Sequence, residues 1–225
     1  MAKIKICIFF GTRPESIKLA PVIKQIEKNS DRFESVLCST GQHKEMLEQV
    51  VNFFELKPDL VLNLMTDNQS LGSLSSKLID RVDNVFEDYK PDIILVQGDT
   101  TTAFLAALFA YYRKIKIGHI EAGLRTFNKF SPFPEEINRQ LISRIADFNF
   151  APTKTAADNL KNEGINAESI YVTGNTIVEA LNWSLEKLEK NNNYLELEFL
   201  DGKSDLIQDA KNNLKLVLVT MHRRE

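Results

Sequence analysis

The chain has 225 residues, a formal net charge of −3, 43% hydrophobic residues and 26% charged residues. These values are typical of a globular protein, and the slight negative charge excludes nucleic-acid binding through a general excess of basic residues. No apolar run approaches the roughly 20 residues that a membrane-spanning helix needs. We therefore expect neither a nucleic acid nor a membrane as a partner.

Short apolar runs alternate along the chain with longer segments of helical periodicity. Strands are predicted at residues 4–10, 33–40, 92–98, 116–122, 147–152 and 169–174. Helices are predicted at residues 14–29, 44–55, 70–90, 101–114, 134–146, 153–164 and 176–190. Strands that are apolar on both faces, each followed by a helix, predict a parallel sheet covered on both sides. The fold class is therefore α/β, with a Rossmann-like doubly wound parallel sheet.

The two cysteines, Cys7 and Cys38, lie inside predicted strands and have no CxxC spacing. This pattern predicts reduced, buried thiols and a cytoplasmic location. The sequence contains no HExxH or other metal-binding spacing and no GxSxG motif. We therefore expect no metal, no other cofactor and no serine-hydrolase chemistry.

Ligands of a doubly wound sheet bind beyond the carboxyl ends of its strands, so the residues that follow each strand are the candidates. After the first strand, Gly11 permits a tight turn, and Arg13 and Lys18 are cations suited to a phosphate at a helix start. The alternative is an ordinary strand-to-helix turn, with Pro14 at the first helical position and Glu15 stabilised by the helix dipole.

The run QGDTTTAF follows a second buried strand and opens a helix. Asp99 is interpreted either as the N-cap of that helix or as a site residue next to Gly98. The threonines from Thr100 to Thr102 help to cap the helix in the first case and form a polar, donor-rich cradle in the second.

A third strand ends in GHIEAGLR, with Glu121 just past it and Arg125 close behind. Glu135 and Glu136 occupy the first turn of the next helix, where the dipole stabilises each by about 0.3–1 kcal/mol. Such a group of carboxylates predicts a site in which burial and repulsion raise one pKa, as acid–base chemistry requires. His119 is interpreted as a hydrogen-bonded structural histidine or as part of this site.

Seven motifs occur in the order and approximate spacing of the non-hydrolysing UDP-N-acetylglucosamine 2-epimerases: FGTRPESIKLAP, GQHKEM, QGDTTTAF, GHIEAGLRT, SPFPEEINR, VTGNTIVEAL and LVTMHRRE. The chain resembles this family over almost its whole length. The resemblance implies one half of a glycosyltransferase-B-like two-domain architecture. Because family members run well beyond 225 residues, it also implies that the chain is truncated.

The resemblance, together with a polar stretch at residues 191–213, predicts three parts. Residues 1–175 form an N-terminal Rossmann-like domain, and residues 176–213 form a helix and an interdomain linker. Residues 214–225 form the first strand and loop of a second, nucleotide-binding domain.

The activity implied by the resemblance is interconversion of UDP-N-acetylglucosamine and UDP-N-acetylmannosamine, for precursors of surface polysaccharides. The family eliminates UDP to a glycal and adds it back after reprotonation on the other face. By motif, Asp99, Glu121 and Glu135 match the family's catalytic carboxylates, and His222 matches a histidine that assists departure of UDP. Arg13 and Lys18 match family positions that help to hold the phosphates or the sugar. The substrate-binding candidates are these two residues with Gly98, Thr100 and Arg125.

Two alternatives to this activity remain open. A hydrolysing relative releases UDP and free N-acetylmannosamine, and relatives of that kind tend to depart from GTRPE and GDTTT. A non-catalytic binding or assembly module is the other alternative, since one wall of a cleft lacks much of a ligand site. We expect the 225 residues alone to be inactive, and the resemblance implies a homodimer and a UDP-amino sugar as the substrate.

Overall fold

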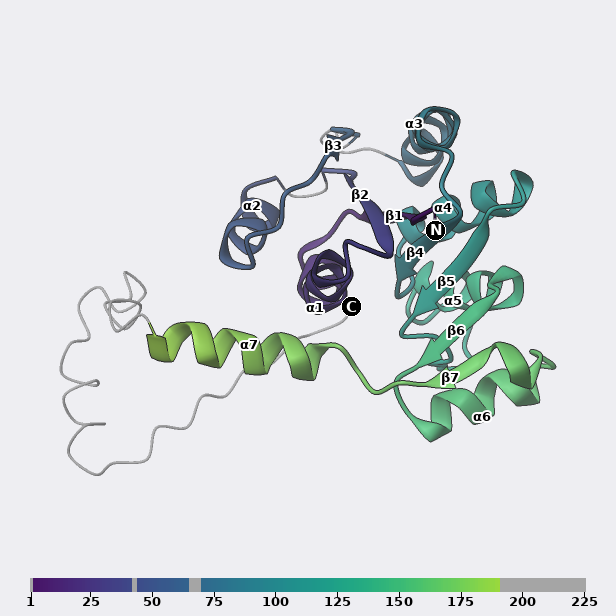
Figure 1. Ribbon diagram of the computed structural model, residues 1–225. Helices are drawn as coiled ribbons and strands as arrows, with labels where there is room; N and C mark the ends of the chain where they lie inside the picture. Colours follow the sequence, from purple (N-terminus) through teal and green to yellow (C-terminus); the bar gives the residue numbers. More distant parts are fainter. Residues whose placement is uncertain (1, 42–43, 65–69, 191–225) are drawn as a thin grey trace, which may run out of the picture. The chain divides into compact units, whose positions relative to one another are not determined.

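The computed structural model describes residues 2–41, 44–64 and 70–190 (Figure 1). Residues 1–182 belong to one compact unit and residues 183–225 to another. His222 and the boundary expected at residue 213 lie outside the described residues, and the boundary expected at residue 175 stays a prediction. None of the helices in the described ranges is both long and apolar enough to cross a membrane.

In the described part of the chain, seven parallel strands form one sheet in the order β3-β2-β1-β4-β5-β6-β7. The strands are β1 (Ile4–Phe10), β2 (Phe33–Ser39), β3 (Leu60–Val61), β4 (Ile93–Gln97), β5 (Lys116–Ile120), β6 (Phe148–Ala151) and β7 (Ile170–Val172). The helices are α1 (Arg13–Lys28), α2 (Lys44–Phe53), α3 (Leu71–Tyr89), α4 (Thr101–Tyr112), α5 (Glu135–Ile145), α6 (Lys154–Asn162) and α7 (Ile177–Lys190), with a short 3-10 helix η1 (Ala167–Ser169). The predicted α/β class and the six predicted strands are confirmed.

The strand order reverses at the centre of the sheet. The chain runs outward from β1 to β3, returns to the other side of β1 as β4, and then runs outward to β7. In doubly wound sheets the loops on either side of such a reversal diverge and leave a crevice at the carboxyl edge. The loops after β1 and β4 are therefore the expected walls of a site.

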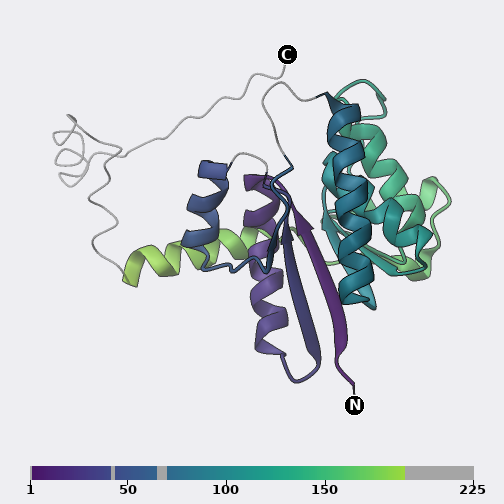
Figure 2. The same ribbon diagram turned by 90° about the horizontal axis from the view of Figure 1, so that it is seen from above.

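Helices cover both faces of the sheet. On one face, α3, α4 and α5 pack side by side, and Leu78 and Val82 of α3 share a buried core with Cys7 and Phe9 of β1. The alternate β1 residues Ile8 and Phe10 point to the opposite face, where α1 lies (Figure 2). The loops at the sheet edge are thus carried by a sheet that is buried on both sides.

The first turns of α1, α4 and α6 are capped by hydroxyl side chains. Thr12 accepts a hydrogen bond from the backbone N–H of Glu15, and Thr100 and Thr153 cap α4 and α6 in the same way. Such caps satisfy N–H groups that have no partner within the helix. The assignment of Asp99 as the N-cap of α4 is wrong by one residue, since Thr100 is the cap.

The strand β3 was not expected from the sequence. Only Leu60 and Val61 take part, and they pair with Cys38 and Ser39 of β2. Two residues at the sheet edge are too few to produce an alternating pattern of apolar and polar side chains.

Candidate active site

Glu121 lies at the centre of a group of side chains at the carboxyl edge of the sheet. It follows β5 directly, and its φ of 66° lies in the left-handed region that residues other than glycine seldom adopt. The Nζ atom of Lys18 lies 2.7 Å from Oε1 and 2.7 Å from Oε2 of Glu121. Gln97 Nε2 donates to Oε2 at 2.6 Å, and Asn175 Nδ2 donates to Oε1 at 3.0 Å. The carboxylate is therefore held from α1, β4 and the segment after β7.

Asp99 forms a second charged pair at the same edge. The Nη2 atom of Arg139, on α5, lies 2.6 Å from Asp99 Oδ2, and Asn138 Nδ2 donates to the Asp99 carbonyl at 2.9 Å. Burial raises the pKa of Asp99; the positive charge of Arg139 opposes the shift, and the carboxylates of Glu135 and Glu121 add to it. Asp99, Glu121 and Glu135, predicted from separate motifs, therefore lie close enough to influence one another.

Glu135 begins α5 and carries a buried acceptor. Its Oε2 atom has no hydrogen-bond partner among the described residues, and neither has Nε of Arg139. A buried polar atom without a partner costs about 1–3 kcal/mol, so such atoms in a site are suited to a ligand's polar groups. A sugar hydroxyl supplies both a donor and an acceptor of the kind required.

Glu15 closes the turn between β1 and α1. Its Oε2 accepts hydrogen bonds from the backbone N–H groups of Gly11 at 2.9 Å and Thr12 at 2.7 Å, and its Oε1 accepts from the Thr100 hydroxyl at 2.7 Å. Burial raises the pKa of Glu15, and these hydrogen bonds oppose the shift. Because a carboxylate of the chain occupies both N–H groups, the structure favours an ordinary capped turn over a phosphate-binding turn.

The predicted substrate-binding residues near this turn differ in what they already contact. Lys18 is paired with Glu121, and the Thr100 hydroxyl both donates to Glu15 and caps α4. Arg13 is exposed and forms no ion pair with a described residue. Its guanidinium is therefore available to a phosphate or a sugar.

Gly98 leaves space beside Glu121. Its φ is +70°, and a Cβ at this position would lie 3.8 Å from Oε2 of Glu121. The glycine is required by the left-handed backbone rather than by crowding.

Arg125 does not join the group. Its side chain is fully buried, its Nε and Nη2 atoms each lie 2.7 Å from a carboxylate oxygen of Glu163, and its Nη1 donates to the Leu124 carbonyl. A guanidinium whose donors are taken by the chain is suited to holding the loop after β5. The substrate-binding role expected for Arg125 stays a prediction.

His119 is a structural histidine, as one of its two interpretations proposed. It is fully buried, with Nε2 2.7 Å from the Gly98 carbonyl and Nδ1 3.2 Å from the Ser143 hydroxyl. Burial lowers the pKa of His119 to about 4, although the hydrogen bond to Gly98 opposes the shift. The neutral ring supports the backbone beside Asp99.

Sequence reasoning missed the partners of the carboxylates. The spacing of Thr12 and Glu15 is that of a capping box, which predicts the contacts of Glu15 with the turn. Gln97 and Asn175 contact Glu121 from 24 and 54 positions away along the chain. Arg139 contacts Asp99 from a different element. No local sequence pattern predicts these contacts.

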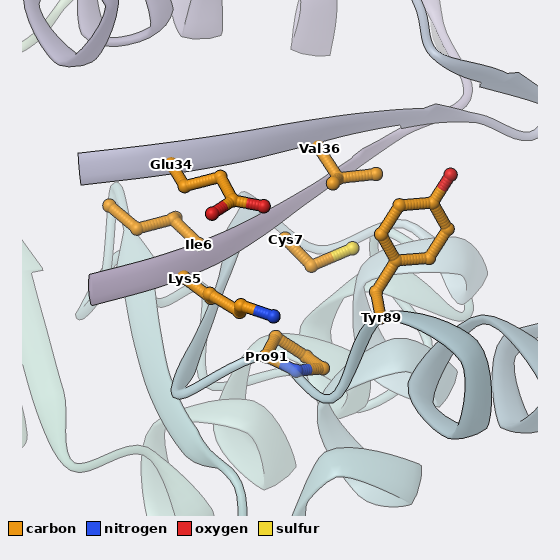
Figure 3. Close-up of a pocket in the computed structure, with 7 residues that line it drawn as sticks. All are labelled: Lys5, Ile6, Cys7, Glu34, Val36, Tyr89 and Pro91. Atoms are coloured by element: carbon orange, nitrogen blue, oxygen red, sulfur yellow. The ribbon is translucent and has the colours of Figure 1, made fainter. Parts of the chain in front are cut away.

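The described residues contain no group of three or more His, Cys, Asp and Glu side chains that could hold a metal ion. Figure 3 shows a pocket elsewhere, lined by Lys5, Ile6 and Cys7 of β1, Glu34 and Val36 of β2, and Tyr89 and Pro91. It lies near the starts of the strands, away from the carboxyl edge. Burial raises the pKa of Cys7, and that of Cys38 to about 12, so these free thiols are unreactive.

Comparison with known proteins gives the fold and the family. The UDP-N-acetylglucosamine 2-epimerase model matches residues 24–225. The UDP-N-acetylglucosamine 2-epimerase of Bacillus subtilis is 47% identical over 225 residues, which are 100% of this chain and 55% of the relative. The chain thus spans about half the length of the curated relatives it matches.

A crystal structure of UDP-GlcNAc 2-epimerase from Neisseria meningitidis bound to UDP-GlcNAc superposes with a TM-score of 0.79 and 51% identity. The match covers 83% of this chain and 50% of the other. A lipopolysaccharide outer core galactosyltransferase shares the fold at 15% identity and a TM-score of 0.52. The sheet is therefore one half of a glycosyltransferase-B-like two-domain fold, and the chain belongs to the UDP-N-acetylglucosamine 2-epimerase family.

Proposed function

We propose that the protein interconverts UDP-N-acetylglucosamine and UDP-N-acetylmannosamine, without net hydrolysis, for precursors of surface polysaccharides. The observation that carries the proposal is the pair of carboxyl groups Glu121 and Asp99 at the carboxyl edge, in unlike surroundings, in a chain of this family. Two carboxyl groups whose environments differ are suited to work as a base and an acid.

The chemistry requires proton transfer at a carbon that is not acidic. The C2 proton of the sugar is not next to a carbonyl group, so its removal is coupled to cleavage of the C1–O bond to UDP. The C–H electron pair forms the C1–C2 double bond of a glycal, and UDP leaves with the C1–O pair. Return of UDP to C1 with a proton delivered to the other face of C2 gives the epimer.

The contacts support distinct roles for the two groups. Glu121, ion-paired with Lys18, is proposed as the base at C2. Asp99 is proposed as the proton donor, since burial raises its pKa and favours its protonated form. Glu135 is proposed to bind the sugar through its unpartnered Oε2, and Arg13 to bind the diphosphate.

Three further residues are included in the proposed site. The side-chain hydroxyl of one of them is already hydrogen-bonded within the chain, and another lies outside the described residues. Gly98 and Thr100 are proposed to border the substrate through their backbone. His222, outside the described residues, is proposed to assist departure of UDP, as its motif implies.

The test is incubation with UDP-N-acetylglucosamine in deuterium oxide, followed by NMR. Because the chain spans about half of its relatives, the assay uses the chain alone and joined to the part of the B. subtilis relative that lies beyond the match. We expect the joined protein to form the epimer with deuterium at C2. Epimer without deuterium contradicts the mechanism, and free UDP equal to the product indicates the hydrolysing alternative.

We also infer a cytoplasmic homodimer. The free, buried cysteines Cys7 and Cys38 support a reducing compartment. The exposed aromatic side chains of Tyr111 and Tyr112 on α4 support burial of that surface by a second copy. Sedimentation equilibrium tests the dimer, and a monomer at all concentrations contradicts it.

A further inference from the structure

The side-chain amide of Asn175 contacts two parts of the molecule at once. Its Oδ1 atom accepts a hydrogen bond from the backbone N–H of Ile177 at 3.1 Å, and its Nδ2 atom donates to Oε1 of Glu121 at 3.0 Å. The first contact satisfies an N–H group in the first turn of α7, as a helix cap does. Because the two contacts use opposite ends of the amide, a single orientation makes both.

We propose that Asn175 is a positioning residue, which fixes the Glu121 carboxylate by tying it to the first turn of α7. The link between the two side chains stands on its own geometry. Its meaning for the reaction rests on the proposed function, in which Glu121 is the base.

Glu121 needs such a contact because its other partners leave one side of the carboxylate unsupported by a neutral donor. Lys18 contacts both oxygens, and Gln97 contacts Oε2 alone. Asn175 supplies the matching neutral donor to Oε1. With a donor on each oxygen in addition to the ammonium group, rotation of the carboxylate costs a hydrogen bond in either direction.

The backbone before Asn175 does little to hold it in place. Thr173 and Gly174 are exposed, and a Cβ built on Gly174 would meet no atom within 4 Å. The Thr173 N–H donates to the Ala151 carbonyl, which ends the pairing of β7 with β6. The contact with Glu121 is therefore a principal anchor of the segment that leads into α7.

Replacement by aspartate separates positioning from simple capping. Asp is as good an N-cap as Asn, and its charge is favoured at a helix N-terminus, so a capping role alone predicts that Asn175→Asp is neutral or stabilising. A positioning role predicts the opposite, because Asp cannot donate and places a second carboxylate against Glu121. Changing Glu121→Gln removes that repulsion and restores a donor between the two side chains.

The experiment is a double-mutant cycle on the full chain, with urea unfolding followed by circular dichroism near neutral pH. The four proteins are the wild type, Asn175→Asp, Glu121→Gln and the double variant. We expect Asn175→Asp to raise the unfolding equilibrium constant at least about fivefold in the wild-type background, and less than about twofold in the Glu121→Gln background, as coupled neighbours do. An equal effect in both backgrounds, or no effect in either, overturns the proposal.

Asn166 provides the matched control. Its Oδ1 atom caps η1 by accepting from the Glu168 N–H at 3.1 Å, and it makes no contact with Glu121. Asn166→Asp is expected to change the unfolding constant less than about twofold in both the wild-type and the Glu121→Gln backgrounds. A background-dependent effect at Asn166 would mean that the coupling at Asn175 is not specific, which also overturns the proposal.

The second measurement uses the joined protein described above. We expect Asn175→Asp to lower kcat at least about tenfold while KM changes less than about threefold, since the substrate contacts remain and the base is displaced. An unchanged kcat overturns the positioning role. Absence of turnover in the wild-type protein contradicts the proposed function instead, and the unfolding cycle still decides the link between Asn175 and Glu121.

Discussion

At the scale of single residues, burial decides which titratable groups belong to the chemistry and which to the fold. His119 and Asp99 lie beside the same turn, and burial disfavours the charged form of both, so it lowers the pKa of His119 and raises the pKa of Asp99. The histidine is satisfied by the Gly98 carbonyl and Ser143, whereas Asp99 faces other charged groups. The first arrangement serves stability and the second is suited to proton transfer.

The buried imidazole gives a pH dependence of stability. The pKa of His119 falls from 6.5 in the unfolded chain to about 4 in the fold, so its contribution is fully present above pH 6.5 and is lost as the pH falls through about 4. The difference corresponds to about 3 kcal/mol. When the pH is lowered from 7 to 4, the urea midpoint of the wild type should therefore fall further than that of His119→Gln. Parallel losses in the two proteins would contradict this assignment.

The left-handed backbone of Glu121 has a measurable cost. Glycine adopts a φ of 66° readily, whereas alanine pays about 1 kcal/mol there. Glu121→Gly and Glu121→Ala lose the same ion pair, so we expect the glycine variant to be more stable by about 1 kcal/mol in thermal or urea unfolding. Equal stabilities would show that the strain has relaxed.

The residues at strand ends were predictable, but their contacts were not. Asp99 and Glu121 are marked by buried runs that end in a polar residue, a pattern visible in one short window of sequence. The ion pair of Lys18 with Glu121 spans 103 positions, and only the strand order brings its members together. The same limit applies to Arg125, since its partner Glu163 lies on a later segment.

At the scale of elements, α5 holds the loop that precedes it. The Glu136 carboxylate is fully buried and accepts hydrogen bonds from the N–H groups of Thr126 and Phe127 and from Gln140. Burial disfavours its charged form, but these hydrogen bonds outweigh burial and lower the pKa of Glu136. The sequence suggested only a favourable helix dipole for this residue.

Removal of this carboxylate should therefore loosen the loop between β5 and α5. We expect Glu136→Ala to lower the free energy of unfolding by about 3 kcal/mol at pH 7. We also expect the loop to become open to proteolysis after Phe127 or Phe130. The lowered pKa means that this stabilisation is present above about pH 4.5 and is lost as the pH falls through the folded-state value. A difference that persists unchanged at pH 3 would contradict the role of the charge.

A second element contact fixes the start of the same loop to α6. A Cβ on Gly123 would lie 2.2 Å from the Ala156 carbonyl oxygen, at a φ of +89°. We expect Gly123→Ala to cost more than about 3 kcal/mol, since backbone would have to move. Gly174 is the control, because its φ of +84° imposes the same backbone cost with no atom nearby. Gly174→Ala should lower the free energy of unfolding by about 1 kcal/mol, and an equal decrease for the two variants would exclude the steric explanation.

At the scale of the whole molecule, alternating strands and helices were sufficient to predict the doubly wound class. The order of the strands within the sheet became known only from the structure, because periodicity identifies a strand but not its neighbours. The strand β3 was not predicted because it is so short, with only Leu60 and Val61 paired at the edge of the sheet.

The chain spans about half of its relatives, and this bears on binding. One wall of a cleft supplies few contacts to a nucleotide and leaves the site open to water. We expect calorimetry with UDP-N-acetylglucosamine to give weak or no binding to the 225 residues alone and measurable binding to the joined protein. Tight binding by the chain alone would contradict this expectation.

The hydrogen bonds of Glu15 have a consequence for exchanging parts between relatives. A single carboxylate joins the turn after β1 to Thr100, across the reversal of the strand order. A chimera that takes β1 and α1 from one relative and β4 and α4 from another is thus expected to keep this hydrogen bond only if both parents carry a matching carboxylate and hydroxyl at these positions. The two loops are inherited as one unit, although 85 residues separate them along the chain.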